Sequence, residues 1–223
     1  MYKRQGPSSQ FSAITPNGSR LYVVNVGGIT QTVSVIDTSS NTVVATVTVG
    51  SNPQGVAATG TKVYVTNQNA NTVSVISTAT NQVVGTITVG NTPYGVAVNS
   101  AGTRAYVANF FGNSVSVIDA SNQVIATVAV GTNPRGVAVN ADGSRVYVTN
   151  QSAGTMSVID TTNNAVVSTI TIGGGPRAVA LNADGTRAYV TNSTYVSVID
   201  TSSRTVVTTV GVGSSPIGVA VLG

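Results

Sequence analysis

Alternating apolar and polar positions recur along the chain in short runs that are separated by turn-forming residues. Near the middle of the chain the runs are Arg135 to Val139, Arg145 to Asn150, Thr155 to Asp160 and Ala165 to Ile172. Runs rich in Val, Ile and Thr and bounded by Gly, Pro, Asn and Asp predict strands. Because no stretch has apolar residues at helical spacing, the pattern predicts an all-β fold.

The same four runs recur as one repeating unit. The second run of each of the five units contains the motif Tyr-Val-x-Asn. These motifs start 42, 42, 41 and 42 residues apart, at Tyr22, Tyr64, Tyr106, Tyr147 and Tyr189. The third run carries Ser-Val-Ile five times, starting at Ser34, Ser74, Ser116, Ser157 and Ser197. A four-stranded unit of about 40–45 residues predicts a β-propeller blade built of four antiparallel strands. A β-helix would instead repeat about every 20 residues.

Local chemistry supports this interpretation. The second run is apolar or aromatic on both sides of the pleat, with Val146 and Val148 on one side and Tyr147 and Thr149 on the other, as a sheet covered on both faces requires. A Gly/Pro stretch precedes each first run and marks the crossing between blades, since proline cannot donate to a sheet ladder. The Asn that ends each second run is expected to cap the following turn.

These signals divide the chain into a non-repeat tail at 1–9, an array of five complete blades at 10–216, and a final segment at 217–223. The blades are expected at about 10–50, 51–90, 91–131, 132–173 and 174–213. Residues 217–223 repeat the beginning of a first run and predict one extra inner strand. The sequence leaves two arrangements open, an open arc and a five-blade ring.

At the Tyr-Val-Thr-Asn motifs, residues 10 to 223 resemble the YVTN family of β-propeller repeats, found in archaeal and bacterial surface-layer and secreted proteins. The resemblance implies an extracellular or cell-surface scaffold with a structural or adhesive role. Related propellers commonly have seven blades, so the resemblance also implies a fragment of a larger ring. The first five residues resemble the adapter remnant seen in metagenomic assemblies, and a signal sequence would then lie upstream.

Composition restricts the chemistry further. Charged residues make up only 7% of the chain, all six acids are Asp, and there is no His, Glu or Cys. A Ser-His-Asp triad and a His- or thiolate-ligated metal therefore cannot form, and we expect no catalytic residue, metal or cofactor. Two alternatives stay open. One, which the resemblance implies, is a fragment of a lactonase-like periplasmic propeller hydrolase or lyase whose catalytic residues lie in missing blades, and the other is an intracellular protein–protein interaction platform.

The ten Lys and Arg residues form no basic run, so we expect no nucleic-acid partner. No apolar run approaches the roughly 18 residues of a membrane helix, so we expect no membrane insertion.

The start of each second run should face the end of the third, which predicts cross-strand ion pairs in four units: Arg20–Asp37, Arg104–Asp119, Arg145–Asp160 and Arg187–Asp200. The second unit has Lys62 and Ser77 at these positions.

Five residues form the predicted binding site. Tyr94, Arg135 and Arg177 follow the crossing prolines, and Phe110 and Phe111 occupy a loop where other units have polar residues. Exposed aromatic residues beside arginines are typical of recognition surfaces, so we expect an unknown protein or carbohydrate ligand on this loop face. The alternative is that the Phe pair packs against a neighbouring loop or a missing blade. Uncovered blade faces at the ends of an open arc also predict self-association.

Overall fold

The computed structural model describes residues 11–26 and 30–221, and these form five four-stranded antiparallel sheets. The expected tail at 1–9, together with Leu222 and Gly223, lies outside the described residues. Strands provide nearly all the regular structure, apart from one 3-10 turn, η1 (Gln68–Ala70), and the all-β prediction is confirmed. No helix in the described part of the chain is long and apolar enough to cross a lipid bilayer.

Each sheet is one blade, and within a blade the strands follow one another in sequence order. The first two blades consist of β1 (Ser12–Ile14), β2 (Arg20–Asn25), β3 (Thr32–Asp37) and β4 (Thr42–Thr48), and of β5 (Pro53–Ala58), β6 (Lys62–Asn67), β7 (Thr72–Ser77) and β8 (Val83–Thr88). The third consists of β9 (Pro93–Val98), β10 (Arg104–Asn109), β11 (Ser114–Asp119) and β12 (Val124–Ala129). The last two consist of β13 (Pro134–Val139), β14 (Arg145–Asn150), β15 (Thr155–Asp160) and β16 (Ala165–Thr171), and of β17 (Val179–Leu181), β18 (Arg187–Thr191), β19 (Tyr195–Asp200) and β20 (Thr205–Gly211).

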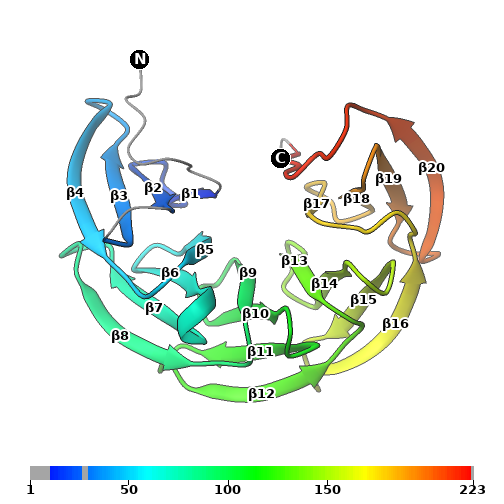
Figure 1. Ribbon diagram of the computed structural model, residues 1–223, viewed down its shortest axis with the longest axis horizontal. Coiled ribbons are helices and arrows are strands. Elements are labelled where there is room, and N and C mark those ends of the chain that lie inside the picture. The colour runs from blue at the N-terminus through cyan, green and yellow to red at the C-terminus, as the bar shows by residue number, and fades with distance from the viewer. Residues whose placement is uncertain (1–10, 27–29, 222–223) are drawn as a thin grey trace.

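The five blades are arranged around a common axis as an open arc, with the first strand of each blade innermost and the fourth outermost (Figure 1). The opening lies between the first blade and the fifth, so the arc is the correct one of the two arrangements that the sequence left open. Residues 217–221, expected to begin an extra inner strand, form no strand. A first strand pairs with the second strand of its own blade, and no such strand lies beside residues 217–221.

The hydrophobic core lies between blades, and each interface joins two different faces. Tyr106, Val115 and Val117 of the third blade pack against Val146 and Val148 of the fourth. The other three interfaces are built from equivalent positions. The Tyr side of each second strand therefore points to the following blade and the Val side to the preceding one, as the two-sided apolar pattern predicted.

The fifth blade has no neighbouring blade on its Tyr side, as the exposed fraction of one valine shows. Val210 of β20 is 52% exposed. At the same register position of the other blades the exposed fraction is only 5–7%, for Val47, Ile87, Val128 and Ile170. The first blade is less covered on its opposite side, where Leu21 and Val23 are half-buried although their counterparts Val63 and Val65 are fully buried.

Candidate functional site

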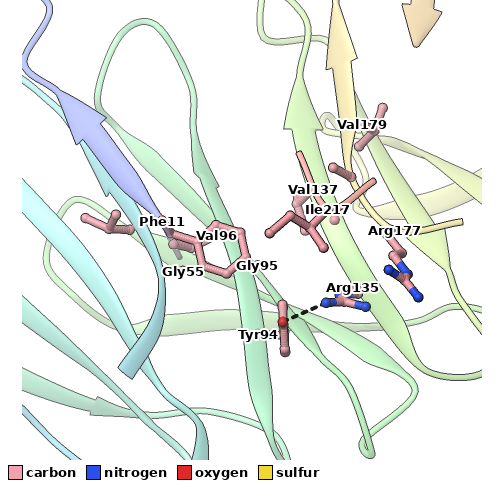
Figure 2. Close-up of a pocket in the computed structure, with 13 residues that line it drawn as sticks. Phe11, Gly55, Tyr94, Gly95, Val96, Arg135, Val137, Arg177, Val179 and Ile217 are labelled. Atoms are coloured by element: carbon pink, nitrogen blue, oxygen red, sulfur yellow. Dashed lines mark hydrogen bonds between the residues drawn. The ribbon is translucent and has the colours of Figure 1, made fainter. Parts of the chain in front are cut away.

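Three of the five predicted site residues line one hollow at the axis of the arc. Tyr94 is the second residue of β9, Arg135 is the second residue of β13, and Arg177 lies just before β17 (Figure 2). The hollow contains about 560 Å³ of space free of protein atoms, part of it open to solvent. Phe11 and Ile217 line it as well, so residues from both ends of the described chain reach the same place.

Close contact between the innermost strands explains why these side chains face the hollow. A Cβ atom built on Gly95 would lie 2.2 Å from the carbonyl oxygen of Arg135, and one on Gly136 would lie 2.4 Å from that of Arg177. Only glycine allows backbones to approach so closely. Neighbouring strands thus meet at the glycines, and Tyr94 and Arg135, which directly precede Gly95 and Gly136, line the hollow together with them.

An aromatic row extends from the hollow onto the loops. The ring centroids of Phe11 and Tyr94 are 5.9 Å apart, those of Tyr94 and Phe110 are 6.3 Å apart, and those of Phe110 and Phe111 are 5.1 Å apart. All three phenylalanines of the chain belong to this row. Phe111 at its outer end is 63% exposed, which is unusual for so large an apolar side chain and marks it as available for contact.

Arg135 is held in place by its neighbours. Its Nη2 donates a hydrogen bond of 2.8 Å to the Tyr94 hydroxyl, and its Nη1 donates one of 3.2 Å to Oε1 of Gln151. The guanidinium carbon also lies 4.7 Å from the centroid of the Tyr94 ring, within cation–π range. The structure therefore links Tyr94, Phe110, Phe111 and Arg135 through direct contacts, and Arg177 joins them as a residue of the same hollow.

Phe11 is the site residue that the sequence analysis missed. It occupies the position that is glycine in the next three blades, as the pairing of Ser12 with Val23 shows against that of Val56 with Val65. The signal that could have revealed it is this replacement of a repeated glycine by an aromatic residue. Gln54, which aligns with Tyr94, is buried and donates a hydrogen bond of 3.0 Å to Oδ1 of Asn52.

The predicted cross-strand ion pairs form in three of the four units. Nη1 of Arg20 lies 2.5 Å from Oδ2 of Asp37, the corresponding distance from Arg145 to Asp160 is 2.9 Å, and Arg187 pairs with Asp200. Because these pairs are partly exposed, they add little to stability.

The fourth predicted pair is not formed. Arg104 faces Asp119 in the ladder, as expected, but these residues make no ion pair. Lys62 of the preceding blade reaches this corner and donates hydrogen bonds of 2.7 Å to the carbonyl oxygen of Ala120 and 2.9 Å to Oδ1 of Asn122. Its ammonium group thus satisfies acceptors in the neighbouring blade, a contact that a within-blade comparison cannot anticipate.

The Asn that ends each second strand has a buried structural role. Asn67, Asn109, Asn150 and Asn192 are fully buried. Nδ2 of Asn109, for example, donates hydrogen bonds of 3.1 Å and 2.9 Å to the hydroxyls of Ser114 and Ser116. The side chain therefore ties the second strand to the third, where the sequence had suggested turn capping.

Hydrogen bonds within the turns lower the pKa of most of the carboxyl groups. The Ser39 hydroxyl and the Ser40 amide, together with Arg20, hold the pKa of Asp37 well below its ordinary value. The same direction applies at four further aspartates, whose carboxylates accept hydrogen bonds from nearby hydroxyls and amides: Asp142, Asp160, Asp184 and Asp200. Burial raises the pKa of four tyrosines: Tyr22, Tyr64, Tyr106 and Tyr147.

These shifts predict a wide pH plateau of stability. A lowered Asp pKa stabilises the fold above the ordinary value of about 3.9, and this contribution is lost as the pH falls through the lower folded value. A raised Tyr pKa stabilises the fold below about 10, and this contribution is lost above it. No His, Glu or Cys side chain titrates in between. We expect equal urea midpoints at pH 5, 7 and 9 and a lower midpoint at pH 3, and a slope across the middle range would contradict this.

The fold and the axial site together define a class: the chain is a β-propeller repeat protein. Residues 138–223 match a family model described as a YNCE-like beta-propeller. No curated protein matches the sequence.

Solved structures agree on the architecture. Hydrazine synthase from Kuenenia stuttgartiensis superposes with a TM-score of 0.81 at 25% identity over 90% of this chain, which spans 65% of that chain. A functionally unknown protein from Desulfotomaculum acetoxidans DSM 771 gives a TM-score of 0.81 at 21% identity, with 93% and 74% of the two chains covered. The Cps50 (Swd1) beta-propeller domain of Myceliophteria thermophila gives 0.74 at 14%, with 90% and 68% covered. The last two likenesses concern the fold alone.

Proposed function

We propose that the protein is a non-catalytic binding scaffold that holds a protein or carbohydrate ligand on the loops around its axis. The observation that carries the proposal is the continuous row from the hollow to the surface, in which Arg135 is fixed by Tyr94 and Phe111 is exposed. Exposed aromatic side chains beside ordered arginines are the usual anchors of recognition surfaces, because they bury large areas with few rotatable bonds.

The proposal places this scaffold outside the cell or at its surface. The resemblance of the repeats to those of surface-layer and secreted proteins supports that location. The low content of charged residues, 7% against about 25% in ordinary globular proteins, is also compatible with an exported scaffold.

A role as part of an enzyme is the second candidate. Its support is the likeness to the hydrazine synthase chain, at 25% identity. The described residues that line the hollow include no carboxylate, so a reaction there would depend on groups supplied by another part or partner. A lactonase-like propeller and an intracellular interaction platform are further alternatives, and the binding screen described next addresses them as well.

A binding screen with one site variant tests the proposal. Purified protein is incubated with immobilised cellulose, chitin, xylan and cross-linked polygalacturonate and with a peptide array, and retention is compared with that of Phe111→Ser. We expect retention on at least one probe and a loss of about tenfold or more in the variant, because Phe111 supplies exposed aromatic area.

Ile125→Ser is the matched control, since Ile125 is a large apolar residue that is also exposed but lies on an outermost strand, β12. Its retention should equal that of the unchanged protein. Equal retention of the Phe111 and Ile125 variants, or retention on no probe, would contradict the proposal. Release of reducing ends or hydrolysis of simple lactones by the unchanged protein would favour the enzyme candidate.

A further inference from the structure

The two faces of the arc differ in charge. One face, which we term the crossing face, consists of the loops between blades and the loops joining the second and third strands. Backbone hydrogen bonds hold these loops together, such as that of 2.8 Å from the Phe110 amide to the carbonyl oxygen of Thr92. The opposite face consists of the remaining turns, and all six Asp residues lie there, at the ends of third strands or in first hairpins.

The basic side chains are divided just as unequally. Six of the eight that the structure describes lie on the opposite face, and three of these form the ion pairs described above: Arg20, Lys62, Arg104, Arg145, Arg187 and Arg204. The other two, Arg135 and Arg177, lie at the crossing face in the axial hollow. In the described part of the chain, this face therefore carries positive charge only, and a concave surface of one sign concentrates counter-charged ligands.

Arg177 has unused hydrogen-bonding capacity. Its Nε is buried and has no hydrogen-bond partner among the described residues, whereas Arg135 already donates to Tyr94 and Gln151. A buried donor without a partner costs free energy, and a ligand acceptor would recover it. Because a guanidinium group presents Nε and Nη as a planar fork, the acceptor that fits best is a group with two coplanar oxygens, a carboxylate.

The surroundings indicate what carries the carboxylate. The aromatic row offers flat apolar surfaces for the C–H face of a sugar ring, and the loops beside it present exposed uncharged polar side chains such as those of Asn91 and Ser152. Sugars combine one apolar face with many hydroxyl groups. An acidic peptide offers no such ring face to the aromatic row.

We propose that the crossing face binds an acidic polysaccharide, with a hexuronate carboxylate held by Arg177 and Arg135 in the hollow (Figure 2) and neighbouring sugar rings stacked along Tyr94, Phe110 and Phe111. The inference rests on the proposed binding function and names its ligand class. Tyr94 has a double role here, because it supplies a ring surface and fixes the orientation of Arg135.

Calorimetric titration with a tetramer of galacturonic acid tests the inference. We expect saturable binding that weakens as salt is added, since the attraction is partly between charges. Arg177→Ala should weaken binding about tenfold or more, as expected for losing a hydrogen bond to a charged group. Arg177→Lys keeps the charge but not the fork, and should recover only part of the affinity.

Arg204→Ala is the matched control for net charge. Arg204 lies on the opposite face, where its guanidinium only reaches the carbonyl oxygen of Val167 at 3.5 Å. Its removal changes the net charge by the same amount as Arg177→Ala but should leave the affinity unchanged. Methyl-esterified tetragalacturonate, in which the carboxylates are blocked, should bind at least about tenfold more weakly than the free acid.

The outcomes separate this inference from the proposed function. Absence of tetragalacturonate binding, equal effects of the Arg177 and Arg204 substitutions, or stronger binding of poly-L-glutamate would each overturn the inference. If a neutral polysaccharide or a peptide were retained through Phe111 while Arg177→Ala had no effect, the scaffold function would stand and the acidic ligand would be wrong.

Discussion

Gly95→Ala is expected to lower the free energy of unfolding by about 1–3 kcal/mol, the usual cost of forcing an extra group into a packed interior. The added methyl carbon would lie 2.2 Å from the carbonyl oxygen of Arg135, a backbone atom that no rotamer change can remove. The third and fourth blades would have to separate at the axis. Urea unfolding, with the midpoint and slope both determined, measures the effect.

Gly218→Ala provides the control within the same motif. Gly218 follows Ile217 as Gly95 follows Tyr94, but a Cβ on Gly218 would have nothing within 4 Å. Its stability should be unchanged or slightly increased, because alanine restricts the unfolded chain. If both variants were equally stable, contact between inner strands could not be what requires glycine at Gly95. In the Gly95→Ala variant the separation of the blades would also displace Arg135, so the affinity for carbohydrate should fall together with the stability.

Val210→Asp is expected to prevent self-association of the 223-residue chain. We propose that the uncovered face of the fifth blade in one copy packs on the first blade of another. Leu21 and Val23 there occupy the positions that receive a preceding blade elsewhere in the arc. Such a head-to-tail contact repeats the packing between blades. A buried carboxylate would oppose it, so the dissociation constant should rise at least about tenfold in sedimentation or light-scattering measurements.

Val207→Asp is the comparison that isolates the uncovered face. Val207 is 50% exposed, and its counterparts are exposed in every blade, including Val44, Val84 and Ile125. It therefore belongs to the outer rim and not to a blade interface, and its substitution should leave association unchanged. A chain that stays monomeric at all concentrations, or equal effects of the two substitutions, would contradict head-to-tail packing.

Repetition explains how much of the fold could be predicted. A single unit leaves strand pairing ambiguous, but five copies show which positions always stay apolar and which turns always contain Gly or Asn. The pairing of Arg145 with Asp160 followed from that comparison and is confirmed. The choice between arc and ring could not be predicted, because the angle between blades depends on packing across each whole interface and not on any local pattern.

Departures from the repeat predicted most of the candidate site. Tyr94, Phe110 and Arg135 differ from their counterparts in other units, and the structure places them in contact. Phe11 was missed because the prediction considered only the residue that follows each crossing proline, and Phe11 aligns one position later. The Lys62 contact was missed for another reason, since it joins two blades and the ion-pair prediction considered only strands within one blade.

The burial of the strand-ending asparagines determines when the chain could receive N-linked glycans. Three Asn residues stand two positions before Ser or Thr, at Asn17, Asn150 and Asn192, and so have the acceptor signature. Asn150 and Asn192 are buried within blades, whereas Asn17 is exposed in a hairpin. A transferase acting after folding would reach Asn17 alone among the three. Glycosylation of Asn150 and Asn192 during export would block the hydrogen bonds through which their amide groups join the second and third strands. A host that glycosylates these two acceptor sites before the chain folds would therefore prevent the blades from forming.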